Sequence, residues 1–485
     1  MKNILLNNIT FALPTRQFVV TSSVTVNESL PKVTEFVLRL IRLCEGVSPE
    51  EVRGYFGFTG KETRLILESL RDQSLIHIED GLVRLTDYAE SKFYTDDDLP
   101  RFSVVKERVD SVDFDLLTFH PIDGRRAGKA PAYASELDVS DEKIATSARL
   151  AEQAYQTHFQ RILKMRERGN DKIDIYKISN VQTKDLCNLP LEVNFEFDGN
   201  LNINRLVAYD EDASQSFRLG VETAVSDAMH RPLAMQAAYL EEFIERFDDK
   251  LIGQFYSKKG FEFERYIKDV FIDKTITYSG ATIPILGNLY MPENQKTIQD
   301  WLRISMEDNV AESAMSFTTS IAWLAPDYKF WGRTGLLDDL YFKLSDALHQ
   351  HKKPKKQAVE HVHLLCPGSK ELMRTLKQQF WSKKEKSVHF FSEVVVGGKI
   401  EVIFLPTRMA CVLFHFSPPG NSSALIPFGF ITRSPELVKE AQVILHEAMG
   451  VDGNGYVGKA TYNNGEGPPP RYVDQFGFIN YCAIR

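Results

Sequence analysis

The dipeptide Asp80-Gly81 stands between two short apolar runs, LIHIE and LVRLT, and limits the local fold more than any other feature of the sequence. Both residue types tolerate the positive φ angles of the tightest hairpin turn, in which two residues join antiparallel strands. The sequence therefore predicts a β-hairpin over residues 75–86.

Helices are predicted before and after this hairpin. From Lys32 to Cys44 the apolar residues recur every three or four positions, which predicts a helix with one apolar face. The residues of that face are Val33, Phe36, Val37, Leu40, Ile41 and Cys44. Ser48 followed by Pro49 marks the start of a second helix.

A third helix is expected to begin at Thr59, because Glu62 follows three residues later and completes a capping box. Its buried face would contain Leu65, Leu67 and Leu70. A fourth helix is expected to start near Thr86, directly after the hairpin.

Residues 31–93, which end in LTDYAESKF, resemble the winged-helix family of helix-turn-helix domains in the order and spacing of these elements. In that family the third helix enters the major groove of DNA and the hairpin touches the backbone or the minor groove. The resemblance implies DNA contacts through Lys61, Arg64, Arg71 and Arg84.

Acidic residues lie among these candidate contacts: Glu62, Glu68, Asp72, Glu79 and Asp80. A surface that reads a DNA groove depends on uncompensated Lys and Arg, so the acidic residues weigh against DNA contact. Winged helices also dock proteins, and each arginine can equally lie on a solvated face.

The length of 485 residues predicts two to four domains, at about 100 to 200 residues each. The hydrophobic fraction of 43% and the charged fraction of 26% are those of a globular protein. No apolar stretch reaches the roughly 18 residues of a membrane span, and the N-terminus does not resemble a signal peptide. We therefore expect a cytoplasmic protein without membrane contact. Five widely spaced cysteines argue against a zinc site and a disulfide framework.

The net charge of −8 excludes a protein that coats nucleic acid over its whole surface. Residues 349–389 nevertheless carry a local balance of +7. The candidate DNA-binding lysines there are Lys352, Lys353, Lys355, Lys356, Lys383 and Lys384. Phe380 and Trp381 lie between the two groups and could stack on bases, although a charged surface that maintains solubility is the alternative.

The pattern predicts four segments. Residues 1–95 form the winged-helix module with a leading strand at residues 17–26. Residues 101–312 form a mixed middle region with long helices, one of them from Ser140 to about Arg168, and with a hairpin at Asp198-Gly199. Residues 313–449 alternate strands and helices, and residues 450–485 form a Gly-, Pro- and aromatic-rich tail that docks on another surface. The fold class is α+β multidomain.

In residues 313–449 the expected strands are TTSIAWLAP, HVHLLCP, EVVV, IEVIFLP, ACVLFHF and ALIPFGFIT. Their alternation with helices predicts a partly parallel sheet covered by helices. This order resembles one half of the phospholipase D-like fold. An active member uses a His-x-Lys pair, in which the histidine attacks phosphorus and the lysine neutralises phosphate oxygens. Met409 and Cys411 occupy the corresponding positions, so the resemblance implies a degenerate site.

Other candidate sites are histidines and one loop. His361 and His363 have the alternate spacing of two metal ligands on one strand, but two partly buried histidines are the simpler interpretation. The loop CPGSK, residues 366–370, precedes a helix and favours anions, yet it lacks the full phosphate-binding pattern. We expect no metal and no cofactor.

The sequence favours a non-catalytic, DNA-associated regulatory or scaffolding subunit of a multiprotein assembly, with protein partners. The resemblance to winged-helix and phospholipase D-like proteins points to prokaryotic regulators or anti-phage accessory proteins. One alternative is a phosphodiesterase or nuclease with an atypical site at His361, His363 and His415. The other is a winged-helix transcriptional regulator that senses a small ligand.

Overall fold

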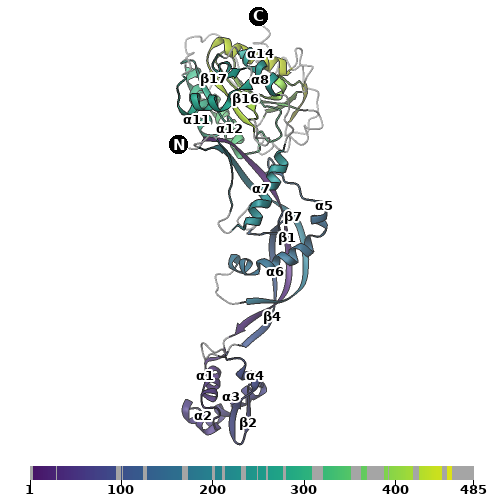
Figure 1. The fold of residues 1–485 in the computed structure, drawn as a ribbon, viewed down its shortest axis with the longest axis vertical. Helices are drawn as coiled ribbons and strands as arrows, with labels where there is room; N and C mark the ends of the chain where they lie inside the picture. Colours follow the sequence, from purple (N-terminus) through teal and green to yellow (C-terminus); the bar gives the residue numbers. More distant parts are fainter. Residues whose placement is uncertain are drawn as a thin grey trace. The chain divides into compact units, whose positions relative to one another are not determined.

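The computed structural model describes residues 4–28, 30–93, 100, 102–123, 128–166, 173–198, 202–209, 213–230, 236–247, 250–257, 260–276, 280–307, 320–350, 362–368, 387–391, 393–418, 425–449 and 456–460. Helices and strands are mixed throughout, as the α+β prediction requires (Figure 1). The chain divides into two compact units. One contains residues 1–15, 124–139 and 187–485, and the other contains residues 16–123 and 140–186.

Residues 30–93, here called the N-terminal module, contain the elements that the sequence predicts. They are α1 (Lys32–Leu43), α2 (Pro49–Phe56), α3 (Gly60–Asp72), β2 (Ile76–Glu79), β3 (Leu82–Leu85) and α4 (Asp87–Glu90). The strands β2 and β3 pair antiparallel. Asp80 and Gly81 join them with φ angles of 54° and 79°, which are the positive values that a two-residue turn demands.

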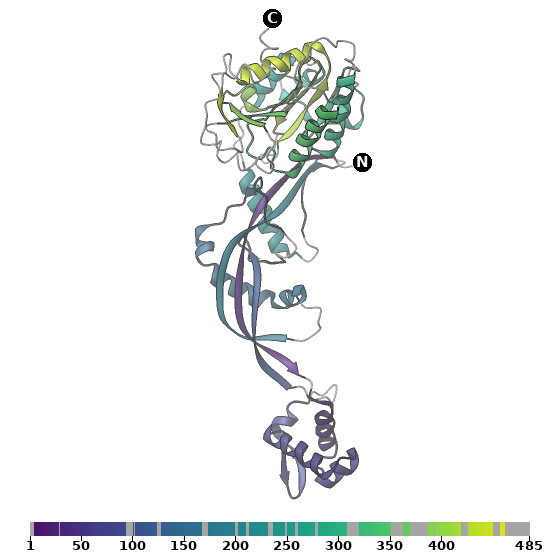
Figure 2. The same cartoon turned by 180° about the vertical axis from the view of Figure 1, so that it is seen from behind.

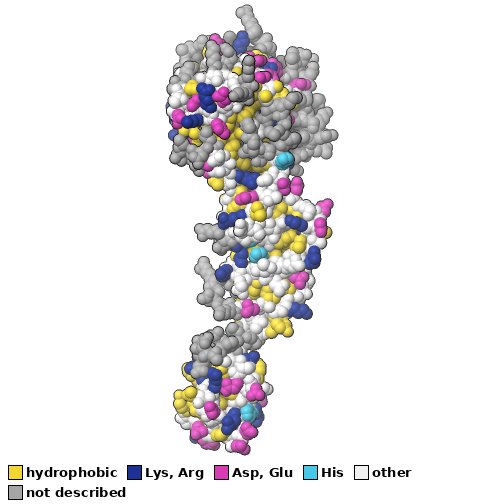
Figure 3. Space-filling model, in the orientation of Figure 1, with side chains coloured by type: hydrophobic (Ala, Val, Ile, Leu, Met, Phe, Trp, Pro, Cys, Tyr) yellow, Lys and Arg dark blue, Asp and Glu magenta, His cyan; other side chains and the backbone are white. Residues whose placement is uncertain are grey.

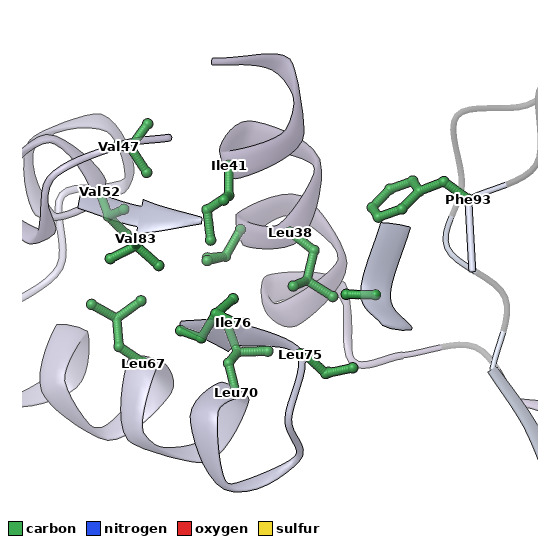
Figure 4. Packing of buried hydrophobic residues seen from close by; sticks show 12 residues of the cluster. Leu38, Ile41, Val47, Val52, Leu67, Leu70, Leu75, Ile76, Val83 and Phe93 are labelled. Carbon is green, nitrogen blue, oxygen red and sulfur yellow. The ribbon is translucent and has the colours of Figure 1, made fainter. Parts of the chain in front are cut away.

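The core of the N-terminal module lies between α1, α3 and the hairpin (Figure 4). Leu38 and Ile41 point inward from α1 and meet Leu67 and Leu70 of α3, with Val83 of β3 beside them. The predicted core positions are wrong in part: Val33 and Phe36 are exposed on α1, and Leu65 is exposed on α3. Leu38 and Thr63 are buried instead, because the packed face of each helix is rotated from the face that apolar spacing suggests.

A six-stranded sheet contains strands much longer than the sequence predicts. Its order is β5–β4–β1–β7–β8, and β6 pairs with β1. The strands are β1 (Ile4–Glu28), β4 (Phe102–Asp115), β5 (Pro121–Ile122), β6 (Ser135–Glu136), β7 (Ile173–Phe197) and β8 (Ile203–Val207). The leading strand predicted at residues 17–26 is part of β1, which begins at Ile4 and ends at Glu28, and β7 is 25 residues long.

Helical segments of the middle region follow or precede these strands. They are α5 (Asp141–Ala145), α6 (Ser147–Arg166), α7 (Gln215–Met229), α8 (Gln236–Phe247), α9 (Lys250–Gly253), α10 (Phe263–Ile267) and the π-helix η1 (Lys268–Ile272). The single helix predicted from Ser140 is divided into α5 and α6 at Thr146. A small hairpin, β9 (Tyr256–Ser257) and β10 (Gly260–Phe261), separates α9 from α10.

The C-terminal part builds an eight-stranded sheet of order β11–β17–β16–β15–β12–β13–β14–β18. The strands are β11 (Thr282–Leu286), β12 (Ile321–Leu324), β13 (Val362–Pro367), β14 (Ser387–Phe391), β15 (Ile400–Leu405), β16 (Met409–Phe416), β17 (Ile426–Thr432) and β18 (Tyr456–Ala460). The pairs β12–β13 and β13–β14 are parallel and the other neighbours are antiparallel, so the predicted partly parallel sheet is confirmed.

Helices cover this sheet (Figure 2). On one face α8 and α14 (Pro435–Met449) pack together, and Phe243 of α8 contacts Phe414 of β16 with ring centroids 5.5 Å apart. The helices α11 (Pro292–Glu307) and α12 (Gly335–Gln350) pack against each other. Every residue of β15, β16 and β17 is buried, as apolar runs covered on both faces require.

The strand predicted at EVVV, residues 393–396, is wrong. This segment leads into a short 3₁₀ turn, η2 (Val396–Gly398), and β14 lies earlier at Ser387–Phe391. Gly397 and Gly398 have φ angles of 55° and 69°, and a Cβ at Gly398 would lie 2.6 Å from the Cβ of Asp327. The close approach of the chain to Asp327 therefore overrides the strand preference of the valines.

Part of the predicted docking tail joins the sheet. Residues Tyr456–Ala460 form β18, which pairs antiparallel with β14. The rest of residues 450–485 lies outside the described residues. Among the described helices, none is both long and apolar enough to cross a lipid bilayer.

Candidate nucleic-acid interface

The start of α3 is fixed by a reciprocal capping box. The Thr59 hydroxyl accepts a hydrogen bond from the Glu62 amide at 3.3 Å, and the Glu62 carboxylate accepts one from the Thr59 amide at 2.8 Å. These hydrogen bonds from Thr59 lower the pKa of Glu62 below its ordinary value. The carboxylate of Glu62 is thus committed to the helix end, where it complements the helix dipole.

Three of the four predicted contacts in the N-terminal module lie exposed on α3: Lys61, Arg64 and Arg71. Arg64 and Arg71 line a concavity of about 310 Å³ together with Arg53 of α2. The remaining lining residues are Pro49, Glu50, Gly60, Thr63, Leu67, Glu68 and Ile78. The hollow therefore lies between α2 and α3 and reaches the hairpin.

The lining of this concavity carries three arginines against two glutamates. Within the part of the chain that the structure describes, Arg53, Arg64 and Arg71 form no ion pair, so their guanidinium groups can bind an external anion. Figure 3 shows basic and acidic side chains interspersed over this module.

Arg84, the fourth predicted contact, is held away from the tip of the hairpin. It is half-buried, and its guanidinium donates a hydrogen bond of 2.7 Å to the carbonyl oxygen of Glu45. The tip itself consists of Asp80 and Gly81. Arg84 therefore ties the hairpin to the turn between α1 and α2.

Sequence reasoning missed Arg53. The residue lies four positions before Gly57, the left-handed residue that ends α2, and its side chain is exposed. The one signal in the sequence is its position on the second predicted helix, directly before the third. Only the packed geometry shows that it shares a hollow with Arg64 and Arg71.

The second group of candidate lysines lies outside the described residues. It comprises Lys352, Lys353, Lys355, Lys356, Lys383 and Lys384. His361 and the loop residues Ser369 and Lys370 also lie outside the described residues. Contact of these lysines with DNA stays a prediction.

Two predicted histidines are buried in the eight-stranded sheet. His363 on β13 is 9% exposed, and its Nδ1 lies 3.3 Å from Nε2 of His389 on β14. His415 on β16 is 1% exposed, and its Nε2 lies 2.8 Å from a carboxylate oxygen of Glu401. The other oxygen of Glu401 accepts a hydrogen bond of 3.0 Å from the Trp323 indole. Both histidines thus contact buried polar partners.

The positions that replace the His-x-Lys pair are also buried. Met409 and Cys411 are fully covered within β16. Burial, together with the negative charge of Glu401, raises the pKa of the Cys411 thiol well above its ordinary value. A protonated, covered thiol is a poor nucleophile. Among the described residues, no group of three or more His, Cys, Asp or Glu side chains is placed to hold a metal ion.

A second, larger cavity of about 830 Å³ lies beside β11. Ten of its fifteen lining residues are aliphatic, aromatic or proline, among them Phe271 of η1 and Ile285 of β11. Its polar lining residues are Asp198, Lys274, Glu293, Asn294 and Thr297. Size and lining are those of a small-molecule site.

Comparisons with known proteins assign no family. No protein-family model matches the chain, and no curated protein matches it. Among solved structures, a match is the archaeal chromatin protein TrmBL2, whose structure is described as showing a novel mode of DNA binding. The match has 12% sequence identity, covers 43% of this chain and 66% of that chain, and has a TM-score of 0.19. The chain thus spans just under two thirds of that protein's length, and a TM-score this low supports no structural argument.

Proposed function

We propose that the N-terminal module contacts duplex DNA through α2 and α3, and that the chain acts as a DNA-associated, non-catalytic subunit. The observation that carries the proposal is the set of three arginines, Arg53, Arg64 and Arg71, around one concavity. Guanidinium groups bind phosphate oxygens in a bidentate manner and remain charged at any physiological pH.

The acidic neighbours limit the kind of contact. Glu50 and Glu68 line the same hollow, so its lining has one net positive charge. An interface of this kind neutralises few phosphates, and its affinity depends only modestly on salt. Glu68 also faces outward on α3, where a carboxylate is suited to accept a hydrogen bond from the amino group of cytosine.

The finer role that we propose is regulatory or scaffolding, within an assembly that includes other proteins. The eight-stranded sheet would be the degenerate half of a phospholipase D-like fold. The parallel strands β12, β13 and β14, with α12 between the first two, support this resemblance. The buried Met409 and Cys411 support a role in binding rather than phosphoryl transfer.

Fluorescence anisotropy with a labelled duplex tests the DNA contact. For the triple variant Arg53→Ala, Arg64→Ala and Arg71→Ala, the slope of log K against log salt should decrease by about 0.9 for each phosphate that the variant no longer neutralises. The matched control is Lys296→Ala, which removes an exposed charge on α11. An unchanged slope and affinity in the triple variant would remove the proposal.

The cavity beside β11 supports a second candidate, the ligand-responsive regulator. Its apolar walls suit a small apolar molecule with one polar end. The dye 8-anilinonaphthalene-1-sulfonate is a suitable probe, because its fluorescence rises in apolar sites. The substitution Thr297→Trp should fill the cavity and reduce that rise, whereas Lys296→Trp on the adjacent exposed position should not. Equal fluorescence in the two variants would contradict this candidate.

A further inference from the structure

The cavity beside β11, here called the β11 cavity, is lined by residues that all belong to one of the two compact units of the chain. Its walls are largely apolar, and its polar lining residues are Asp198, Lys274, Glu293, Asn294 and Thr297. The hydrogen bonds that these five side chains can still make limit the polar group that a bound molecule can carry.

The side-chain amide nitrogen of Asn294 is used by the protein itself. It donates to the backbone carbonyl oxygens of Leu286, Gly287 and Asn288 at 2.9, 3.2 and 2.9 Å. An amide NH₂ group has two protons, so three acceptors at these distances leave no proton for a ligand. The remaining polar atom of this side chain is its oxygen, which can only accept.

The hydroxyl proton of Thr297 is also used within the protein. Thr297 donates it to the backbone carbonyl oxygen of Glu293, one turn earlier in α11, at 3.0 Å. A hydroxyl has one proton, so toward a ligand Thr297 can only accept. The carboxylates of Asp198 and Glu293, when ionised, also only accept. Lys274 is therefore the single donor among the five polar side chains of the lining.

The middle of β11 adds an acceptor without a donor to this wall. Among the described strands, β17 is the one neighbour of β11. The amide of Gly287 donates to the carbonyl oxygen of Pro427 at 2.8 Å, so the odd-numbered residues of this strand face β17. Pro284 accordingly lies on the other edge, where it has a carbonyl oxygen but no N–H.

The formal charge of the lining favours a cation. Asp198 and Glu293 stand against Lys274, so the lining has one net negative charge. Glu293 is in the first turn of α11, where its carboxylate complements the positive end of the helix dipole. An anionic ligand would meet two carboxylates, whereas a cationic ligand is complementary to them.

One wall of the β11 cavity has an unusual backbone. It includes residues of η1, a π-helix, which is a rare form that often occurs at functional sites. Beyond η1 the carbonyl oxygen of Asp269 accepts hydrogen bonds from the amides of Thr275 and Ile276 at 2.9 and 3.4 Å. Lys274, within this turn, has a φ of 51°, which is costly for a residue other than glycine. Backbone strain of this kind is concentrated at ligand sites.

We infer that the β11 cavity binds a primary ammonium ion that carries an apolar chain or ring. An ammonium group has three N–H donors and a positive charge, and it matches a lining of carboxylates, an amide oxygen and a hydroxyl. The apolar part of the ligand lies against aliphatic walls such as Ile285. The inference rests on the proposed ligand-responsive regulator, whose ligand it identifies by chemical class.

Displacement of the neutral dye Nile red from the full chain tests the class of ligand, because the dye fluoresces in apolar sites. Octylamine, octanol and octanoate have the same apolar chain, and near neutral pH their polar ends are a cation, a neutral hydroxyl and an anion. Octylamine should displace the dye at the lowest concentration and octanoate at the highest. Octanol or octanoate that binds as tightly as octylamine overturns the inference.

Two substitutions of exposed lining residues should shift the affinity for octylamine in opposite directions. Glu293→Gln removes a negative charge and should weaken binding about two- to fivefold, the usual effect of one exposed charge. Lys274→Gln removes the positive charge and should strengthen binding by a similar factor. Octanol should bind both variants as it binds the unaltered chain. Octylamine affinity that is unchanged in both variants overturns the inference.

The matched control for these variants is Asp300→Asn. Asp300 is an exposed acidic residue on α11 that does not line the cavity, so its removal should leave the affinity for octylamine unchanged. A loss in Asp300→Asn as large as the loss in Glu293→Gln would show that the net charge of the protein, and not the lining, attracts the amine. An unchanged thermal midpoint in each variant shows that the fold is retained.

The inference and the proposed ligand site can fail separately. Thr297→Trp, which fills the cavity, should weaken the binding of all three compounds. If it does so while the three compounds bind the unaltered chain equally well, the cavity is a ligand site and the preference for ammonium is wrong. If no compound displaces Nile red, or if Thr297→Trp leaves their binding unchanged, the ligand site is wrong as well.

Discussion

Nε2 of His415 lies 2.8 Å from a carboxylate oxygen of Glu401, and neither side chain is more than 1% exposed. The pair occupies neighbouring strands of the eight-stranded sheet, β16 and β15, and the Trp323 indole satisfies the second carboxylate oxygen. A buried acid in this position needs both partners, because an unpaired carboxylate is costly in a water-free interior.

The substitution His415→Ala should therefore destabilise the fold by about 3–5 kcal/mol, since it leaves Glu401 without one of its partners. Urea unfolding followed by intrinsic fluorescence measures this change. The same variant separates structure from catalysis. If the chain hydrolyses a phosphodiester and His415→Ala abolishes turnover without loss of stability, the result favours the nuclease alternative. The structural role of His415 as the partner of Glu401 would then be wrong.

Two leucines on α3 should respond differently to truncation. Leu70 is 1% exposed in the core of the N-terminal module, whereas Leu65 is 56% exposed. Leu70→Ala should cost about 2–5 kcal/mol, because apolar burial is removed and a cavity remains. Leu65→Ala should change stability by less than about 0.5 kcal/mol. Thermal unfolding followed by circular dichroism compares the two variants, and similar losses would contradict the packing described here.

Stability should fall as the pH drops from about 6.5 to about 4. Burial, with the positive charges of Arg161 and His158 nearby, lowers the pKa of His120 from its ordinary 6.5 to about 4. The unfolded chain therefore binds a proton at a pH where the folded chain does not, and protonation favours unfolding.

The measurement is the free energy of unfolding across this pH window in the unaltered chain and in His120→Gln. In the variant, the slope of the free energy of unfolding against pH should decrease by an amount that corresponds to at most one bound proton. His158→Gln is the comparison, because burial and Arg161 lower the pKa of His158 as well. An identical pH profile in His120→Gln would show that His120 does not titrate as described.

The lysines of residues 352–356 should add to DNA affinity independently of the arginine hollow. Alanine at Lys352, Lys353, Lys355 and Lys356 should lower the salt dependence of binding if these side chains neutralise phosphates. Fluorescence anisotropy over a range of salt concentrations measures the slope. An unchanged slope would remove the basic segment from the interface.

Local signals in the sequence were sufficient to predict the helices and the hairpin of the N-terminal module. The Asp80-Gly81 turn and the Thr59–Glu62 capping box are present because their chemistry involves residues at most three positions apart. Interactions of such short range depend little on the rest of the fold. The order of three helices, hairpin and short helix followed from them.

Long-range pairing could not be predicted in the same way. Apolar spacing does not reveal which neighbour covers a face, so Val33 and Phe36 of α1 were assigned to the core although both are exposed. The alternation of apolar and polar residues predicted only part of β1. The valines at residues 394–396 suggested a strand, which the turn at Gly397 and Gly398 prevents. Arg53 was missed because its role depends on which residues α3 places beside it.

The central place of β1 affects how the chain is synthesised. The strands that pair with β1 are β4, the short β6 and β7, and the last of them to be synthesised is β7, whose first residue is Ile173. A ribosome that adds about 5–20 residues per second needs roughly 7–30 seconds to go from the end of β1 to the start of β7. Throughout that interval β1 lacks its pairing with β7. The N-terminal module emerges from the ribosome early in the same interval. It can therefore fold before β1 has paired with all of its neighbouring strands.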